Sequence, residues 1–351
     1  MLDSGDLSFR DFMELALYHP QFGYYTRPTS PVGKEGDYVT SPTLSPVFSF
    51  AMQRLVGEFL RRSDDEVSTV VDIGCGDGRL INEIADACGE AECFGVDRAL
   101  TRVTMGKASF VSDLPDVPRG ASQLILTNEL FDALPYARLV QRGEHLHELW
   151  VREKDGALDW SEHEAESAYD DYFAARNIVL DDGQFADIAL EWEAFYGDLC
   201  DFVTRGLIVT FDYGFRERQL FDKRIRRFGT AASYTQQRVT RDLLSNPGGR
   251  DLTAHINFDD LIRAGERRGF RTLFFDRQAK FLLALGITEH PLFRPSTELQ
   301  IDGLEQAVAL LEAREEARRL VLPDGIGEDI RVLVQARDVP MEGWSFQQPL
   351  F

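Results

Sequence analysis

A glycine-rich turn is the segment whose residue types point most directly to chemistry. Residues 69–73 form a short β-branched run, and Gly74-Cys75-Gly76-Asp77-Gly78 follows them. Apolar residues then recur at helical spacing from 80 to 88. Glycines between a strand and a helix allow the backbone to approach a ligand without obstruction by Cβ atoms. We therefore expect Gly74 and Gly76 to contact either a dinucleotide or S-adenosylmethionine.

The residues around this turn favour the second ligand. A dinucleotide fingerprint needs glycine or alanine where this chain has Arg79, and Asp72 would repel a pyrophosphate. The carboxylate of Asp72 suits the ammonium group of S-adenosylmethionine instead. Asp97, about 20 residues further on, is expected to accept hydrogen bonds from ribose hydroxyls. Asp113 is expected to meet the adenine amino group.

Strand-like and helix-like segments alternate along most of the chain. Further strands are expected at 93–97, 108–111, 123–127, 206–212, 271–275 and 330–335, and helices near 6–18, 47–60 and 304–319. Such alternation predicts an α/β fold with βαβ units around a parallel sheet. We divide the chain into an N-terminal helical or lid segment (1–66), a core in two parts (67–137 and 201–337), an inserted cap (138–200), a substrate-side insertion (215–260) and a tail (338–351).

The composition excludes several classes of protein. The 351 residues include 38 Lys+Arg and 59 Asp+Glu, which gives a net charge of -21. This charge argues against extensive binding of DNA or RNA and against an anionic membrane surface. No apolar run approaches the roughly 20 residues that a membrane span needs. The four cysteines form no C-x-x-C pair, so we expect free thiols and a cytoplasmic protein.

Six further segments give the chain a family resemblance. They are Tyr18-His19-Pro20-Gln21-Phe22-Gly23-Tyr24-Tyr25, Gly36-Asp37-Tyr38-Val39-Thr40-Ser41-Pro42, Asn128-Glu129-Leu130-Phe131-Asp132-Ala133-Leu134-Pro135, Asp212-Tyr213-Gly214, Asp251-Leu252-Thr253-Ala254-His255-Ile256-Asn257-Phe258 and Gln278-Ala279-Lys280-Phe281-Leu282-Leu283-Ala284-Leu285-Gly286. Together they resemble the MidA family of S-adenosylmethionine-dependent methyltransferases, which includes the mitochondrial complex I assembly methyltransferase. The resemblance implies a class I (Rossmann-like) methyltransferase sheet with an N-terminal helical segment and an inserted cap.

The resemblance also implies a reaction and its partners. The expected reaction is methylation of an arginine in a protein substrate, with S-adenosylmethionine as cofactor. The mitochondrial relatives suggest a respiratory-complex subunit as one possible acceptor. A homodimer is a further option, while neither nucleic acid nor membrane insertion is expected.

The expected chemistry assigns roles to particular side chains. A guanidinium group has a pKa above ~12, so its methylation needs carboxylates that hold it and accept a proton. We expect Glu129 to be the guanidinium ligand or base, with Asp132 as its orienter. Asn128 would contact cofactor or acceptor, and His255 is either a base with a near-neutral pKa or a structural histidine. Asp37, Thr40 and Ser41 lie in a loop expected to fold over the amino-acid moiety of the cofactor.

Other interpretations stay open at this stage. A non-catalytic assembly factor could retain the fold, and the short stretch between Asp97 and Phe110 is the main argument for it. A small-molecule methyltransferase is possible, while Asp72 and Arg79 disfavour an NAD-dependent oxidoreductase. The basic run at 216–227 is either a solvated helical face or a dock for an acidic region of the substrate protein. The spacing of the histidines and cysteines does not support a metal site.

Overall fold

A seven-stranded sheet with one additional short strand forms the centre of the molecule. The computed structural model describes residues 5–27, 40–63, 67–235, 238–295 and 303–348. The strand order is β15-β16-β10-β5-β2-β3-β4, and β14 (Ile256–Asn257) pairs with the end of β10. The strands are β2 (Ser68–Ile73), β3 (Ala91–Val96), β4 (Ser109–Val111), β5 (Ser122–Asn128), β10 (Gly206–Phe215), β15 (Arg271–Arg277) and β16 (Ile330–Arg337).

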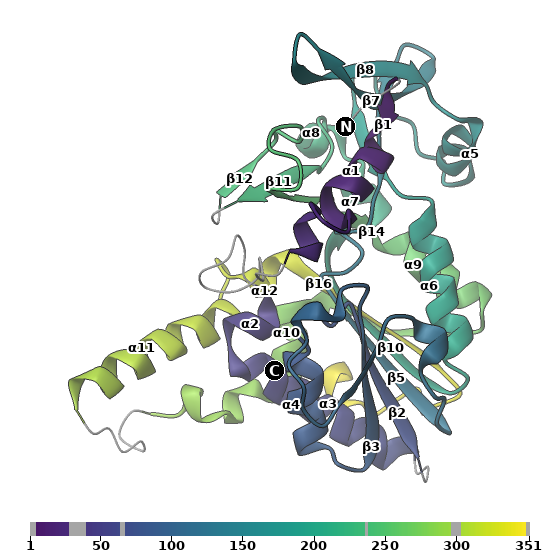
Figure 1. The fold of residues 1–351 in the computed structure, drawn as a ribbon. Helices are drawn as coiled ribbons and strands as arrows, with labels where there is room; N and C mark the ends of the chain where they lie inside the picture. The colour runs from purple at the N-terminus through teal and green to yellow at the C-terminus, as the bar shows by residue number, and fades with distance from the viewer. Residues whose placement is uncertain (1–4, 28–39, 64–66, 236–237, 296–302, 349–351) are drawn as a thin grey trace.

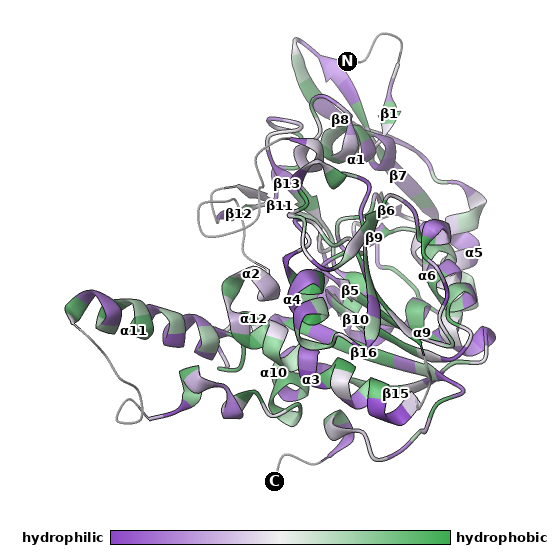
Figure 2. Cartoon of the chain, turned by 60° about the horizontal axis from the view of Figure 1, so that its bottom comes forward, coloured by the Kyte–Doolittle hydropathy of each residue, from purple (hydrophilic) through white to green (hydrophobic). Residues whose placement is uncertain are grey.

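The direction of the last strand defines the topology. Strands β2, β3, β4, β5 and β10 pair in parallel, whereas β16 runs antiparallel between β10 and β15. A parallel sheet with one antiparallel strand inserted near its edge confirms the predicted α/β fold. Figure 2 shows the central strands as largely hydrophobic, which is typical of a sheet covered on both faces.

Helices cover both faces of this sheet. Helices α3 (Pro46–Ser63), α4 (Arg79–Ala87) and α10 (Gln278–Ala284) pack with Val70, Leu124 and Val209 into one core. Helices α1 (Phe9–Tyr18), α6 (Glu191–Phe202) and α9 (Phe258–Arg267) pack with Val71, Ile125 and Ile208 into the other. Consecutive residues of each strand thus face opposite layers.

The two ends of the chain pack against these layers. Helix α1 begins at Phe9 rather than at residue 6, because Leu7 and Ser8 form strand β1 and pair with β7 (His145–Lys154) of the cap. Ser8 is the N-cap of α1, because its hydroxyl accepts a hydrogen bond from the backbone N–H of Asp11 at 3.1 Å. In the tail, Trp344 and Phe346 are buried beside Phe281.

The region between β5 and β10 is a second sheet. Strands β6 (Ala137–Arg142), β7 (His145–Lys154), β8 (Ala157–Glu164) and β9 (Phe185–Ile188) pair antiparallel, and α5 (Ser167–Ala175) packs on them. Figure 1 places this cap at the top, the central sheet below it, and α1 between the two. Helix α11 (Leu304–Arg319) extends away from the rest of the molecule.

A smaller sheet and two short helices follow β10. Helices α7 (Glu217–Leu220) and α8 (Lys223–Arg226) precede strands β11 (Ala232–Thr235), β12 (Arg238–Thr240) and β13 (Asp251–Thr253). The sheet order is β12-β11-β13, so β12 lies at an edge. The basic run at 216–227 is therefore divided between two single-turn helices and their loops, and it does not form one helical face.

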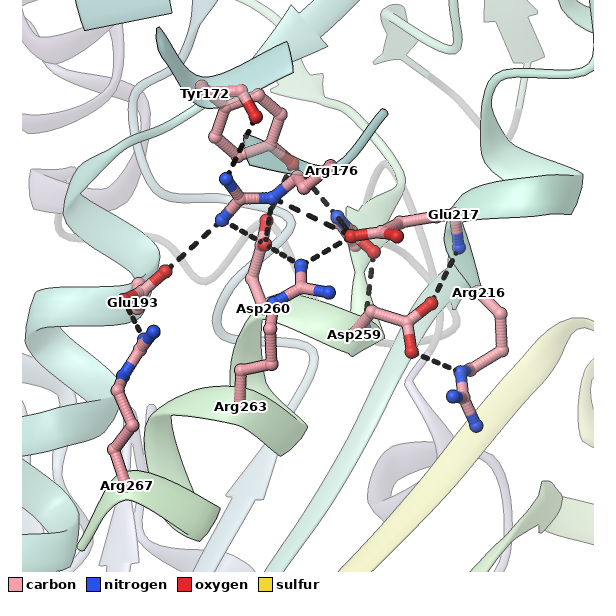
Figure 3. A network of polar contacts seen from close by, with 10 residues as sticks. Tyr172, Arg176, Glu193, Arg216, Glu217, Asp259, Asp260, Arg263 and Arg267 are labelled. Carbon is pink, nitrogen blue, oxygen red and sulfur yellow. Dashed lines mark hydrogen bonds and ion pairs between the residues drawn. The ribbon is translucent and has the colours of Figure 1, made fainter. Parts of the chain in front are cut away.

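A network of ion pairs connects the cap to the core (Figure 3). The Asp260 carboxylate of α9 accepts hydrogen bonds from the Tyr172 hydroxyl at 2.7 Å, from Arg176 Nη2 at 2.7 Å and from Arg263 Nη2 at 2.6 Å. Arg176 also contacts Glu193 of α6 at 3.2 Å and Glu217 of α7 at 3.6 Å. Asp260 thus joins α5 to α9 directly, and Arg176 extends the network to α6 and α7.

Candidate active site

The glycine turn leaves the carboxyl end of β2 and leads into α4. Gly74 and Gly76 both have positive φ, +74° and +59°, a conformation that favours glycine. A Cβ atom at Gly74 would lie 2.9 Å from Leu130 Cδ1, whereas one at Gly76 would have no atom within 4 Å. Gly76 therefore presents bare backbone to open space, as the sequence predicts for a ligand-binding turn.

That open space is a cavity of about 620 Å³ at the carboxyl ends of the parallel strands. Open α/β sheets generally bind their ligands at this edge. One wall comes from the loops after β2, β3, β4 and β5, and the opposite walls come from α1 and α6. The cavity includes the short stretch between Asp97 and Phe110 through Arg98 and Arg102, so this stretch still contributes to its wall.

Most of the predicted cofactor-binding residues line this cavity. They are Thr40, Asp72, Gly74, Gly76, Asp97, Asp113 and Asn128. Asp37 lies outside the described residues. Ser41 lines neither cavity, and its buried hydroxyl donates to Gln278 Oε1 at 3.0 Å, so its contact with the cofactor stays a prediction. Its backbone N–H instead donates to Glu129 Oε1 at 3.3 Å.

Two carboxylates flank the glycine turn. Burial, together with the charges of Asp97 and Asp77, raises the pKa of Asp72 to about 8. Asp97 accepts hydrogen bonds from the backbone N–H groups of Gly76 at 2.9 Å and Ala99 at 2.8 Å. Its carboxylate thus fixes the turn and borders the cavity at once. Asp72 has no cation beside it in the described residues, so a cationic ligand would supply the positive charge that an ionised Asp72 lacks.

A second, smaller cavity of about 70 Å³ lies beside the first. Glu129 and Tyr25 line both cavities. Its other walls are acidic and aromatic, with Asp132, Tyr213, Thr230, Ala232, Tyr234, Asp251, Thr253 and His255. The three predicted catalytic residues Glu129, Asp132 and His255 therefore meet here, although 126 positions separate the first from the last in the sequence.

Glu129 is held between the two cavities by backbone and side-chain contacts. Its φ of +50° is unusual for a residue other than glycine, and its N–H donates to the Phe211 carbonyl at 2.8 Å. Oε1 accepts from Asn128 Nδ2 at 3.2 Å as well as from Ser41. Burial and the neighbouring charge of Asp132 raise the pKa of Glu129 to about 8. The backbone turn and these hydrogen bonds thus fix the position of the Glu129 carboxylate, which has no cation beside it among the described residues.

Asp132 and Asp212 form a buried carboxyl pair below Glu129. Burial raises the pKa of both, and a hydrogen bond joins the two groups, so one of them holds a proton. Asp212 also accepts from the backbone N–H groups of Leu130 at 3.2 Å and Phe131 at 2.8 Å. Asp132 Oδ2 accepts from the Thr253 hydroxyl at 2.9 Å. This pair fixes the loop that carries Glu129.

His255 differs from the near-neutral base that its sequence context suggests. Burial, with the charge of Arg226, lowers its pKa to about 4. The ring stacks on Tyr213, contacts Phe215, and leaves Nδ1 without a hydrogen-bond partner among the described residues. A histidine with this pKa is neutral at pH 7 and a weak base. It therefore fits a wall of the small cavity better than a proton acceptor.

Sequence reasoning did not select several residues of the second cavity. Tyr25, Tyr234 and Asp251 line it, and the Tyr25 hydroxyl donates to Asp251 Oδ1 at 2.8 Å. Tyr25 and Asp251 both lie within segments that carry the family resemblance, which was the available signal. Tyr234 lies outside those segments. In the part of the chain that the structure describes, no group of three or more acidic, histidine or cysteine side chains is arranged to hold a metal ion.

Comparison with known families decides the class of protein. Residues 96–275 match the model of a family described as "Putative S-adenosyl-L-methionine-dependent methyltransferase". The chain belongs to this family. Together with the fold, the family confirms the predicted class I methyltransferase and its cofactor, S-adenosylmethionine. The protein is therefore an enzyme, and the alternatives of an NAD-dependent oxidoreductase and a non-catalytic factor are set aside.

Named relatives and a solved structure agree with this family. The chain is 27% identical over 318 residues to a Drosophila melanogaster protein named "Protein arginine methyltransferase NDUFAF7 homolog, mitochondrial". The aligned region covers 77% of this chain and 69% of that protein. A Caenorhabditis elegans protein of the same name is 24% identical and covers 83% and 75%. A Burkholderia thailandensis crystal structure bound to S-adenosyl-homocysteine superimposes with a TM-score of 0.84 at 26% identity, covering 97% of this chain and 90% of that one.

The relatives also correct one expectation. Four matching relatives carry mitochondrial names, which contradicts the predicted cytoplasmic location. Composition and free thiols indicate a reducing environment, and such evidence does not distinguish one reducing compartment from another. The cytoplasmic prediction is therefore wrong. No helix in the described ranges is both long and apolar enough to cross a membrane.

Proposed function

We propose that this methyltransferase modifies an arginine of a protein substrate. The larger cavity takes the methyl donor and the smaller cavity takes the guanidinium group. The observation that carries this proposal is the position of Glu129, whose side chain borders both cavities. The two relatives from Drosophila melanogaster and Caenorhabditis elegans are named as protein arginine methyltransferases, which supports the same substrate class.

The polar groups and the bare backbone that line the larger cavity fit S-adenosylmethionine. Asp72 supplies a carboxylate for an ammonium group, and Asp97 and Asp113 supply acceptors for hydroxyl and amino groups. Asn128 Oδ1 is buried without a partner in the described residues, so it is a free acceptor at the border of the cavity. Bare backbone at Gly76 permits close approach. When bound, this cofactor supplies an electrophilic methyl group on a sulfonium centre.

The smaller cavity suits a guanidinium group. Its carboxylates are Glu129, Asp132 and Asp251, and its aromatic side chains are Tyr25, Tyr213 and Tyr234. Planar guanidinium groups bind carboxylates through paired hydrogen bonds and stack on aromatic rings. A bound cation would lower the raised pKa of Glu129 and favour its ionised form.

Proton balance assigns a task to Glu129. As the N–C bond forms, the S–C bond of the donor would break and leave its electron pair on the sulfur; one N–H bond of the guanidinium also breaks, because the methylated product retains a single positive charge. Glu129 accepts this proton on a carboxylate oxygen. The Asp132–Asp212 pair already shares one proton, so we assign it to holding the loop rather than to accepting another.

Transfer of a labelled methyl group to synthetic arginine peptides tests the proposal. Wild-type protein should modify arginine, as identified by fragmentation mass spectrometry. Glu129→Gln should lower the transfer rate by about a hundredfold or more. Its affinity for S-adenosylhomocysteine, measured by calorimetry, should stay close to wild type because Gln retains the volume and one acceptor oxygen.

Glu162→Gln is the matched control, since it removes an exposed carboxylate of the cap that pairs with Arg142. It should leave transfer unchanged. Methylation of lysine or of a small molecule by the wild-type protein, or undiminished transfer by Glu129→Gln, would contradict the proposed function.

A further inference from the structure

A basic and apolar surface borders the smaller cavity on the side of α8 and β12. It consists of Arg224, Ile225, Arg227, Phe228, Val239 and Arg241, and we refer to it as the α8–β12 surface. Its three apolar side chains are 70%, 55% and 62% exposed, respectively. Figure 1 shows α8 beside β11 and β12, and Arg241 lies over the Phe228 ring at 5.7 Å, so the two segments are in contact.

The charge of this surface opposes that of the whole molecule. The chain has a net charge of -21, yet residues 222–242 contain six Lys or Arg and two Asp, Asp222 and Asp242. The three arginine side chains of the α8–β12 surface are exposed. None of them forms an ion pair with another described residue, whereas the neighbouring Arg216 and Lys223 pair with Asp259 and Asp181. Arg227 Nη2 donates to the Asp182 carbonyl at 3.0 Å, whereas the guanidinium groups of Arg224 and Arg241 form no hydrogen bond or ion pair with another described residue and remain available to an acidic partner.

Strand register connects this surface to the acceptor cavity. Tyr234 of β11 lies opposite Asp251 of β13 and opposite Val239 of β12. Residues directly opposite each other in an antiparallel pair project from the same face of the sheet. Asp251 and Tyr234 line the small cavity, so Val239 continues the same face outward. Thr230, only two residues after Phe228, lines the cavity as well.

We propose that the α8–β12 surface docks a segment of the acceptor protein that carries acidic and apolar side chains next to the methylated arginine. This inference rests on the proposed function, because it places the flanking residues of an arginine already bound in the small cavity. Acidic side chains would pair with Arg224, Arg227 and Arg241, and apolar ones would cover Ile225, Phe228 and Val239. A solvated surface alone does not account for three large apolar side chains exposed beside a cavity.

Two synthetic peptides of equal length test the docking. Each carries one central arginine and flanking leucines, with glutamates in one peptide and lysines in the other. Binding is measured by fluorescence anisotropy in the presence of S-adenosylhomocysteine, so that it does not depend on methyl transfer. The acidic peptide should bind at least about tenfold more tightly than the basic one, and added salt should weaken its binding.

Charge reversal locates the contact. Arg224→Glu with Arg241→Glu should weaken binding of the acidic peptide by about tenfold and improve binding of the basic peptide. The control reverses two exposed cations elsewhere, Arg318→Glu on α11 with Lys107→Glu, and should leave both affinities unchanged. Thermal unfolding and affinity for S-adenosylhomocysteine check that both double variants are folded.

The outcomes separate this inference from the proposed function. Equal binding of both peptides, or unchanged binding by Arg224→Glu with Arg241→Glu, would overturn the docking surface even if arginine is methylated. Selective binding that responds to charge reversal supports the docking surface even if the peptides are poor methyl acceptors. Methylation of a residue other than arginine would overturn the proposed function by itself.

Discussion

Buried carboxyl groups without a cationic neighbour concentrate at the two cavities. Burial raises the pKa of Asp72, Glu129 and Asp212, whereas a carboxylate with an Arg partner normally has a lowered pKa. Such groups are costly to the folded protein when ionised. Because these groups cluster at one edge of the sheet, they favour the binding of cationic ligands in both cavities that Glu129 lines.

The raised pKa of Asp72 should make the free energy of unfolding depend on pH. Its pKa rises from 3.8 to about 8 on folding, so between these values the folded state holds more protons than the unfolded state. The free energy of unfolding therefore falls as pH rises, by up to about 1.4 kcal/mol per pH unit. Asn cannot ionise, so Asp72→Asn should gain stability relative to wild type as the pH increases from about 4 to 8. Urea unfolding of the ligand-free proteins measures the difference.

The same substitution should carry a functional cost. Without the carboxylate, affinity for S-adenosylhomocysteine should fall by about 1.5–3 kcal/mol, the usual loss for a hydrogen bond to a charged group. Calorimetric titration near pH 8 measures it. A variant that is neither stabilised at high pH nor impaired in binding would refute the assignment of Asp72 to the ammonium group.

At the residue scale, spacing predicted what lies close in the sequence. Glu129 and Asp132 share one loop, and Asp72 follows directly from its place before the glycine turn. Asp251 and Tyr234 reach the site only through the small sheet, which the sequence did not reveal. The surroundings of Ser41 and His255 depend on tertiary neighbours that spacing does not reveal: the Ser41 hydroxyl donates to Gln278, and burial keeps His255 neutral at pH 7.

At the scale of elements, periodicity predicted most strands and helices of the core. It found α11 with the bounds of the structure and placed β2, β5, β10 and β16 to within a few residues. It did not show that β16 runs antiparallel between β10 and β15, because strand order depends on long-range pairing. Hydrophobic periodicity also did not show that Leu7 and Ser8 pair with the cap sheet, because a strand of two residues is too short to show a periodic pattern.

The ion-pair network around Asp260 makes the connection of these elements testable. Asp260 is 2% exposed and receives Tyr172, Arg176 and Arg263. Asp260→Ala leaves two guanidinium groups without this partner, and we expect it to lower the free energy of unfolding by about 3–5 kcal/mol. Glu162→Ala, which breaks the exposed pair with Arg142, should cost about 1 kcal/mol or less. Equal losses in urea unfolding would show that the network does not join cap to core.

At the scale of the molecule, charge is distributed to match the two cavities and the docking surface. The larger cavity has twice as many carboxylates as guanidinium groups on its walls. The carboxylates are Asp11, Glu14, Asp72, Asp77, Asp97, Asp113, Glu129 and Glu191, and the guanidinium groups are Arg10, Arg79, Arg98 and Arg102. A net charge of -21 adds to the negative potential of this cavity. The α8–β12 surface is a local exception.

This field should distinguish the methyl donor from its product. S-adenosylmethionine carries a sulfonium charge that S-adenosylhomocysteine lacks, while both share the same ammonium and carboxylate groups. Salt screens the attraction of the additional charge, because the Debye length falls from about 30 Å at 0.01 M to about 3 Å at 1 M ionic strength. Raising the salt concentration should therefore weaken donor binding more than product binding, and calorimetry of both ligands across this range measures the ratio of the two dissociation constants.

Binding of the product is the control for general effects of salt on the protein. Parallel salt dependences would mean that the acidic walls do not act on the sulfonium centre, whereas a ratio that changes several-fold would show that loss of this charge on methyl transfer helps the product to leave.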